Sequence, residues 1–212
     1  MTMNDENQTA QPPAETSENE DRLGLERIAA FSDGVFAIAI TLLILDIRLP
    51  ASDTVRSDGE LLQDLTSIWP DYRAYIISFL VIGSFWIAHH RKFRKMRRYD
   101  DRLMVLNMLF LMVIAFIPFP TIVISEEGNL TSTIFYSLTI ILAGLLSLAM
   151  TWYSTGSSRL MEIQHPHTRR HEILRGFVVP AIFLLSIAIA VVDHEIAKIS
   201  WLLVVPALLL IR

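Results

Sequence analysis

Residues 27–45 read Arg27-Ile-Ala-Ala-Phe31-Ser32-Asp33 and then GVFAIAITLLIL, and this stretch decides the fold. It places an arginine and a carboxylate at the mouth of a long apolar segment. An aspartate at the centre of a membrane-spanning helix costs about 2.5–3.5 kcal/mol on insertion scales, so ionisable residues at such a boundary usually pair inside the protein and often mark an ion or substrate path. The stretch therefore predicts a membrane helix whose polar entrance has a structural or functional role.

The composition predicts an integral membrane protein. Of the 212 residues, 52% are hydrophobic and 19% are charged, and the mean hydropathy is +0.44. The charges lie in separate stretches rather than being spread along the chain, as they would be in a soluble domain. The sequence contains no cysteine, so disulfides, cysteine-ligated zinc and thiol nucleophiles are excluded.

Six segments have, or nearly have, the roughly 20 apolar residues that a helix needs to cross a bilayer core of about 30 Å. They are residues 28–48, 72–90, 103–124, 131–152, 173–192 and 196–212. The last segment is the shortest and ends at Arg212, whose side chain can snorkel to the interface. The predicted fold class is therefore all-α, a polytopic membrane protein with six transmembrane helices.

The first 22 residues differ sharply from the rest. They are polar, acidic and free of aromatic side chains, which predicts a disordered tail followed by a six-helix domain over residues 23–212. This tail is not a signal peptide, because the first apolar run begins only near residue 28.

Two of the predicted loops are basic and the others are acidic. Residues 91–102 carry seven lysines and arginines, and the connection between spans four and five adds Arg159, Arg169 and Arg170. The positive-inside rule places both basic loops, and with them both termini, in the cytoplasm. On the opposite side, residues 59–68 are compatible with a surface helix against the first span. Two short connections predict antiparallel hairpins, and Pro118-Phe-Pro120 is expected to break the third span.

In the first span, Ile38, Leu42 and Leu45 lie at positions i, i+4 and i+7, within one helical stripe nearly opposite Asp33. If this stripe lined a symmetric pore, rings of aliphatic side chains would form a dry constriction that gates by dewetting. Periodicity alone favours the alternative, that these side chains face lipid or pack in the core. Thr41 either offers its hydroxyl to a passing cation or bonds a carbonyl of its own helix.

Polar residues of three spans converge at the cytoplasmic depth of Asp33. Trp86 and His89 lie at i and i+3 near the end of the second span, and Asn107 lies one turn inside the third. We expect His89 to donate to Asp33, which also accepts from Arg27, because polar groups in lipid need partners. The alternative for Trp86 is a place in the interfacial aromatic belt.

Motifs of enzymes and nucleic-acid-binding proteins are missing. The sequence has no His-Glu-x-x-His, Gly-x-Ser-x-Gly or phosphate-binding glycine loop, and the histidines at 165–171 lie in a polar loop. An intramembrane enzyme lacks a nucleophile, and the basic residues at 91–102 are explained by topology and anionic headgroups. We therefore expect no enzymatic activity, no metal cofactor and no nucleic-acid partner.

With these residues laid out, the chain resembles the prokaryotic TMEM175 family of potassium channels over about residues 25–212. Arg27, Phe31, Ser32 and Asp33 match the family signature at the start of the first helix, and Trp86, His89 and Asn107 also match. The resemblance implies a homotetramer in which the first helix of each subunit lines one pore. The implied pore constriction is Ile38, Leu42 and Leu45, with Thr41 contributing to potassium preference. The implied clamp on the pore helix is Arg27, Phe31, Ser32, Asp33, Trp86, His89 and Asn107.

The expected activity is a leak of K+ with modest preference over Na+, because the chain lacks the Thr-Val-Gly-Tyr-Gly filter of carbonyl-lined potassium channels. Animal relatives carry two copies of the six-helix unit, so the single copy suggests a multi-pass protein of a prokaryotic inner (plasma) membrane. No cofactor is expected, and K+ is the permeant ion. The alternative function is a proton-coupled secondary transporter that uses Asp33 and His89 as a relay.

Overall fold

The computed structural model describes residues 13–52, 54–156, 160–161 and 166–203, and this part of the chain is helical with no strand. The all-α prediction is confirmed. The elements are α1 (Pro13–Leu42), the 3-10 helix η1 (Leu43–Asp46), α2 (Asp58–Ser67), α3 (Trp69–Phe93), α4 (Asp101–Phe116), α5 (Pro118–Glu127), α6 (Leu130–Thr155), α7 (Pro166–Ala190), α8 (His194–Ser200) and η2 (Trp201–Leu203).

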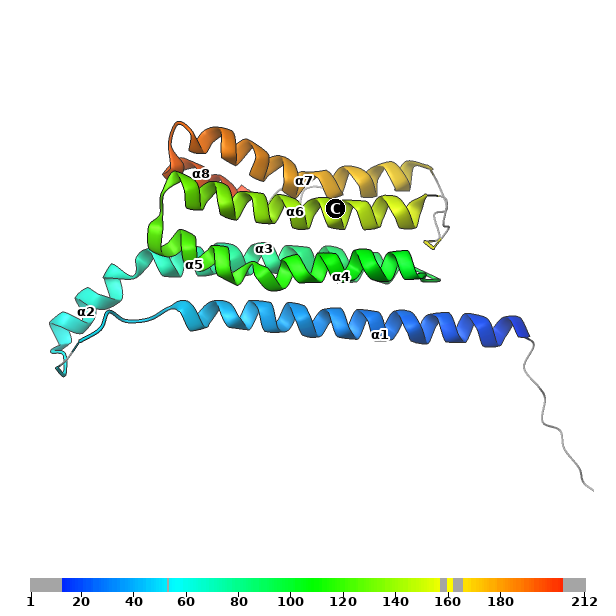
Figure 1. The fold of residues 1–212 in the computed structure, drawn as a ribbon, viewed down its shortest axis with the longest axis horizontal. Coiled ribbons are helices and arrows are strands. Elements are labelled where there is room, and N and C mark those ends of the chain that lie inside the picture. The colour runs from blue at the N-terminus through cyan, green and yellow to red at the C-terminus, as the bar shows by residue number, and fades with distance from the viewer. Residues whose placement is uncertain (1–12, 53, 157–159, 162–165, 204–212) are drawn as a thin grey trace, which may run out of the picture.

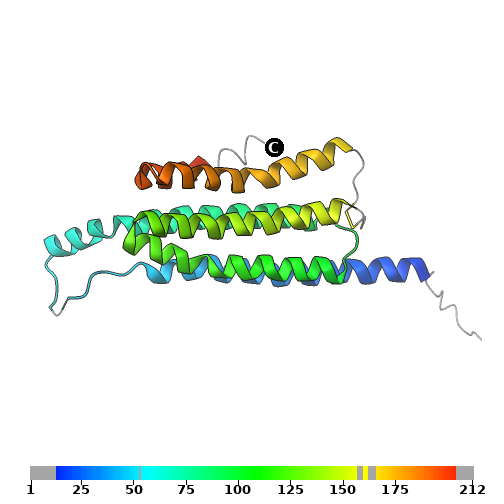
Figure 2. The same cartoon turned by 45° about the horizontal axis from the view of Figure 1, so that its top comes forward.

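The long helices run side by side as one bundle, with α1 along one edge and the α6–α7 pair along the other (Figure 1). In the turned view of Figure 2, α7 is again at one edge, while α4 lies in front of α1 at the other. One end of the bundle, where α3 ends and α4 begins, carries the basic residues 91–102, and we call it the basic end.

Five of the predicted spans are confirmed as helices long and apolar enough to cross a membrane. Most of their ends lie within a few residues of the predicted ends. The third span is broken as expected, because α4 ends at Phe116 and α5 begins at Pro118. The predicted sixth span, residues 196–212, falls on α8 and η2 and then lies outside the described residues, so it stays a prediction.

The prediction of a disordered tail over residues 1–22 is wrong from Pro13 onward, because α1 begins there and extends past the ends of its neighbours at the basic end (Figure 1). Tertiary contacts hold part of this extension. Arg98 pairs with Asp21 at 3.7 Å, and Leu25 is buried. Composition alone did not reveal that a neighbouring loop supplies the partner for an acidic side chain.

Local sequence signals set the other helix ends. Ser57 and Glu60 form a reciprocal capping box at the start of α2, Asp100 accepts from the backbone N–H of Leu103, and Asn129 accepts from that of Ser132. The expected helix near residues 59–68 is therefore confirmed as α2. It does not lie against the first span, however, since it points away from the bundle and none of its residues is buried (Figure 1).

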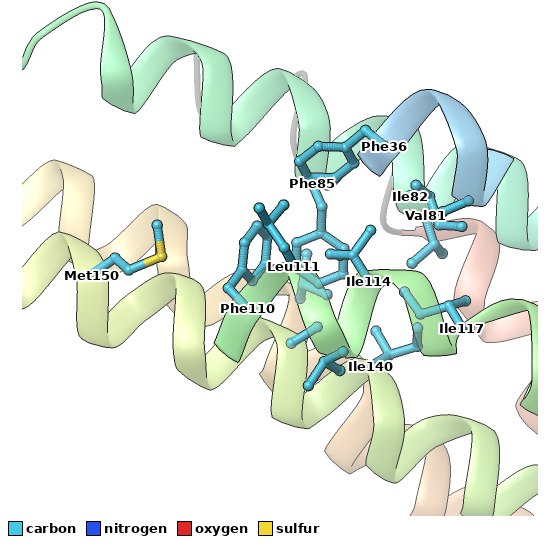
Figure 3. Packing of buried hydrophobic residues seen from close by; sticks show 14 of the residues in the cluster. Phe36, Val81, Ile82, Phe85, Phe110, Leu111, Ile114, Ile117, Ile140 and Met150 are labelled. Carbon is cyan, nitrogen blue, oxygen red and sulfur yellow. The ribbon is translucent and has the colours of Figure 1, made fainter. Parts of the chain in front are cut away.

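The core lies where α1, α3, α4 and α6 meet. Phe36, Val81, Ile82, Phe85 and Ile114 are almost fully buried, and Figure 3 shows their side chains turned toward one another. The rings of Phe36 on α1 and Phe85 on α3 each lie 5.9 Å from the ring of Phe110 on α4. This core fixes the position of α1 relative to the rest of the bundle.

A glycine permits the close packing of α6 on α7. A Cβ atom at Gly144 would lie 2.6 Å from Cγ of Pro180, which sits inside α7. The absence of a side chain at Gly144 therefore lets the proline ring rest against the helix, as small residues do where membrane helices approach closely.

Candidate functional site

The two sides of α1 have opposite environments. Phe36 and Leu43 are each 1% exposed, whereas Ile38, Leu42 and Leu45 are 61%, 42% and 59% exposed. The predicted stripe therefore faces away from the subunit core, which removes the core-packing alternative. In the single subunit its side chains are open to lipid, to another protein surface or to a pore.

The stripe is not one continuous α-helix. The chain tightens to 3-10 geometry from Leu43 to Asp46, so Leu45 follows a turn of about three residues rather than 3.6. Leu45 stays exposed, but its angle to Ile38 differs from the value that the uniform helix predicted.

Thr41 lies on the same open side, and its hydroxyl donates to the carbonyl oxygens of Ala37 at 2.9 Å and Ile38 at 3.0 Å. The hydroxyl thus bonds carbonyl groups of its own helix, which was one of the two alternatives for Thr41. Thr41 is nevertheless exposed, so its hydroxyl oxygen can still accept a hydrogen bond or contact a cation.

A buried hydrogen-bonded chain anchors the opposite side of α1. His89 Nε2 lies 2.9 Å from Asn107 Oδ1, and Asn107 Nδ2 donates to Ser32 Oγ at 3.1 Å. Ser32 Oγ in turn donates to the carbonyl oxygen of Ile28 at 2.8 Å. Since the amide oxygen can only accept, His89 Nε2 is the donor. The three bonds therefore run in one direction, from His89 on α3 through Asn107 on α4 to α1. Three helices are thus joined through one asparagine.

Aromatic rings enclose His89. Its ring stacks on Phe93 at 4.4 Å and on Phe110 at 5.8 Å between centroids. His89 is 1% exposed, so its imidazole is almost completely shielded from solvent in this structure.

Asp33 has a different partner from the expected one. Its Oδ1 atom accepts from Trp86 Nε1 at 2.8 Å, and His89 bonds to Asn107 instead. The predicted His89–Asp33 bond is therefore wrong, because the imidazole points inward from α3 while the indole lies along the α1 side. The indole makes this bond although its residue is 40% exposed, so it is not solely a member of the interfacial belt.

Arg27 and Phe31 do not join this network. Both are exposed, and Arg27 has no hydrogen bond or ion pair to any residue in the described part of the chain. They line a groove of about 470 Å³ between α1 and α4 together with Tyr99, Met104 and Met108. The structure therefore divides the predicted clamp into an interior part and an outward-facing part.

The sequence interpretation missed Lys92, which was counted within a basic loop. Instead α3 continues to Phe93, and Lys92 is 8% exposed with its Nζ atom donating to the carbonyl oxygen of Ser147 at 2.5 Å and to Ser147 Oγ at 3.1 Å. The signal was available, because Lys92 follows the buried His89 at i+3 on the same helical face. It joins α3 to α6 near the basic end.

Several known proteins are similar to this chain. A family model described as "Endosomal/lysosomal potassium channel TMEM175" matches residues 27–118. A potassium channel of Streptomyces collinus is 44% identical over 141 residues, 64% of this chain and 67% of that protein. A potassium channel of Chamaesiphon minutus is 48% identical over 100 residues, 47% of this chain and 49% of that protein. The endosomal/lysosomal proton channel TMEM175 of Bos taurus is 38% identical over 118 residues, 51% of this chain and 25% of that protein.

A solved structure has the same fold. The crystal structure of a lysosomal potassium-selective channel TMEM175 homolog from Chamaesiphon minutus matches with a TM-score of 0.77 and 29% identity, covering 89% of this chain and 98% of that one. The resemblance first seen in Arg27, Phe31, Ser32 and Asp33 is thereby confirmed. The chain belongs to the TMEM175 family.

Proposed function

We propose that this chain is one subunit of a potassium channel in which α1 of each of four copies surrounds a common pore. The observation that carries the proposal is the open stripe of Ile38, Leu42 and Leu45 on a helix whose other side is anchored by buried packing and hydrogen bonds. The names of the bacterial relatives support K+ as the permeant ion. The family is one of channels, and the chain is not an enzyme.

In this proposal the aliphatic rings form a hydrophobic constriction, and permeation depends on the cost of dewetting. Thr41 adds a hydroxyl oxygen beside the constriction, which favours K+ over Na+ only modestly. The interior network of Ser32, His89 and Asn107 holds α1 in register and does not bind the ion. The channel lies in the inner (plasma) membrane of a prokaryote, with both termini cytoplasmic, as the basic loops predict.

The decisive experiment is ion flux from liposomes that contain the purified protein, comparing wild type with Ile38→Asn. A polar side chain at the constriction lowers the dewetting cost, so we expect faster K+ flux and a smaller preference over Na+. Leu185→Asn is the matched control, because Leu185 is 59% exposed and belongs to α7, which lies at the edge of the bundle opposite α1 (Figure 1). The proposal fails if wild type passes no K+ under an imposed gradient, or if Leu185→Asn has the same effect as Ile38→Asn.

Proton permeation is the second candidate, because the animal relatives are named proton channels. A pH-sensitive dye inside the same liposomes separates the two ions. A proton-coupled transporter with an Asp33–His89 relay has less support, since the two side chains bond to different partners. That mechanism predicts saturable flux and loss of coupling in Asp33→Asn.

A further inference from the structure

We propose that a neighbouring copy covers the outer side of α4, with Arg27 of that copy forming an ion pair with Asp101. This inference rests on the proposed function only in that copies are arranged around α1. In this arrangement Arg27 of each subunit pairs with Asp101 of the next subunit.

The outer side of α4 has the pattern of a helix-packing surface. Asp101, Met104, Val105, Met108, Leu109 and Met112 recur every three or four residues and line a groove of about 560 Å³. We call these residues the α4 face. All six are exposed in the subunit. In a membrane, apolar exposure alone does not distinguish lipid from protein, so the charges decide the occupant.

Within the part of the chain that the structure describes, two opposite charges at the basic end have no polar partner. Arg27 and Asp101 are exposed, and neither has a hydrogen bond or ion pair within the described ranges. Nearby carboxylates are already engaged: Asp21 pairs with Arg98 and Glu26 with Arg22, while Asp100 accepts from the Leu103 N–H and the Tyr153 hydroxyl. Ionisable residues of membrane spans often pair with one another.

The register places the two charges at the same depth. α1 and α4 run in parallel and are joined by the Asn107–Ser32 bond of 3.1 Å. Arg27 lies five residues before Ser32, and Asp101 lies six residues before Asn107. At a rise of 1.5 Å per residue these offsets are about 7.5 and 9 Å, so the charges are level to within about 2 Å. Rotation about an axis along the membrane normal keeps that depth, so Arg27 of one copy is level with Asp101 of the next.

The flank of α1 and the α4 face also have compatible shapes. Beside Ile38, the flank of α1 carries Ala30, Gly34 and Ala37, which are exposed, and a Cβ atom at Gly34 would meet nothing within 4 Å. Small residues let another helix approach closely, and methionines adapt to the surface they meet. Such a contact joins two different surfaces, one from each neighbouring subunit. Repeating it forms a closed ring when the rotation from one subunit to the next is a whole fraction of a full turn.

Site-directed crosslinking tests the inference cleanly, because the chain has no cysteine. Arg27→Cys and Asp101→Cys subunits with different affinity tags are co-expressed and treated with a short bis-maleimide, since the Cα atoms of a paired arginine and aspartate lie farther apart than a disulfide allows. We expect a crosslinked dimer that carries both tags. The matched control replaces Asp101→Cys with Leu185→Cys and gives none. Absence of the mixed dimer from the Arg27/Asp101 combination overturns the inference.

Charge reversal provides a second measurement that does not depend on reagent access. Arg27→Asp places like charges at each contact, so the oligomer fraction in detergent should fall about tenfold, and the double variant Arg27→Asp with Asp101→Arg should restore it. If the double variant stays dissociated although it is as folded as wild type by circular dichroism, the pair is wrong.

The outcomes separate this inference from the proposed function. Potassium flux without an Arg27–Asp101 crosslink overturns the interface alone, whereas a crosslinked ring that passes no K+ overturns the channel alone. The competing occupant is an anionic phospholipid bound to Arg27. Native mass spectrometry that finds phosphatidylglycerol retained by wild type and lost in Arg27→Gln, with no mixed dimer, would replace the second copy by lipid.

Discussion

The packed and open faces of α1 both carry apolar side chains, but they differ in how far these side chains are exposed. Phe36 and Ile38 are two residues apart, yet one is 1% exposed and the other 61%. The packed face has aromatic neighbours and ends in a polar network, whereas the side chains of the open face stay exposed among the described residues. The difference teaches that this helix is built to be held from one side and to present the other.

The largest expected effect comes from opening a cavity on the packed face. Phe36→Ala removes a ring that lies 5.6 Å from His89 and 5.9 Å from Phe110, and we expect the free energy of unfolding to fall by about 3 kcal/mol. Ile38→Ala should change it by less than about 0.5 kcal/mol, because its side chain is not packed in the subunit. Denaturation in mild detergent measures both, and equal losses would erase the distinction between the faces.

The second test concerns the polar anchor. Asn107→Leu leaves the buried His89 donor without an acceptor and removes the donor to Ser32 Oγ, so we expect a loss of about 2 kcal/mol in the free energy of unfolding. Thr41→Val is the control on the open face, since its hydroxyl bonds only to its own helix, and it should cost less than about 0.5 kcal/mol. A harmless Asn107→Leu would show that packing alone holds α1.

One substitution at two glycines of α1 sharpens the comparison further. A Cβ atom at Gly24 would lie 2.6 Å from the Tyr99 hydroxyl oxygen, whereas at Gly34 it would meet nothing. Alanine improves helix propensity by about 1 kcal/mol at either site, but overpacking at Gly24 should outweigh it by about 1 kcal/mol. In subunits dissociated by detergent, the two variants are expected to shift the melting temperature in opposite directions. A downward shift of Gly34→Ala in the assembled oligomer alone is the result expected if Gly34 lies at the helix contact proposed above.

The smallest effect tests a surface contact at the opposite end of the bundle. Glu195 bonds to Lys198 and to Arg73, and the Lys198 hydrogen bond lowers the pKa of the Glu195 carboxyl from 4.5. Because the folded-state pKa is lowered, the stabilisation is present above pH 4.5 and is lost as the pH falls through the lowered pKa. The side chain is 48% exposed, so the contribution stays below about 1 kcal/mol.

Hydrogen exchange of residues 194–203, corrected for intrinsic rates, measures this effect. Exchange in α8 should rise at acidic pH in wild type, and Glu195→Gln should show the faster exchange already at neutral pH. A wild-type protein whose α8 exchange is unchanged on acidification would indicate that buried Trp201, and not the ion pairs, holds α8 in place.

Local patterns in the sequence predicted the helices well. The break at Pro118 and the helix near residues 59–68 follow from proline chemistry and a capping box, which act within a few residues. The convergence of Asp33, His89 and Asn107 at one depth was predicted, and the family resemblance added Ser32. Their actual partners were not, because helix rotation, which depends on packing, decides which atoms of His89, Asp33 and Trp86 meet.

The sequence by itself determined that this protein is a helical membrane protein, because bilayer thickness and the cost of buried charge act on any segment of the chain. It also determined the family, through the residues at the start of α1. Only the tertiary structure decided that Ile38 faces outward and that Lys92 is buried against α6. It also decided that Arg27 has no polar partner among the described residues of its own subunit. These outcomes depend on which surfaces the other helices leave uncovered, and no short stretch of sequence contains that information.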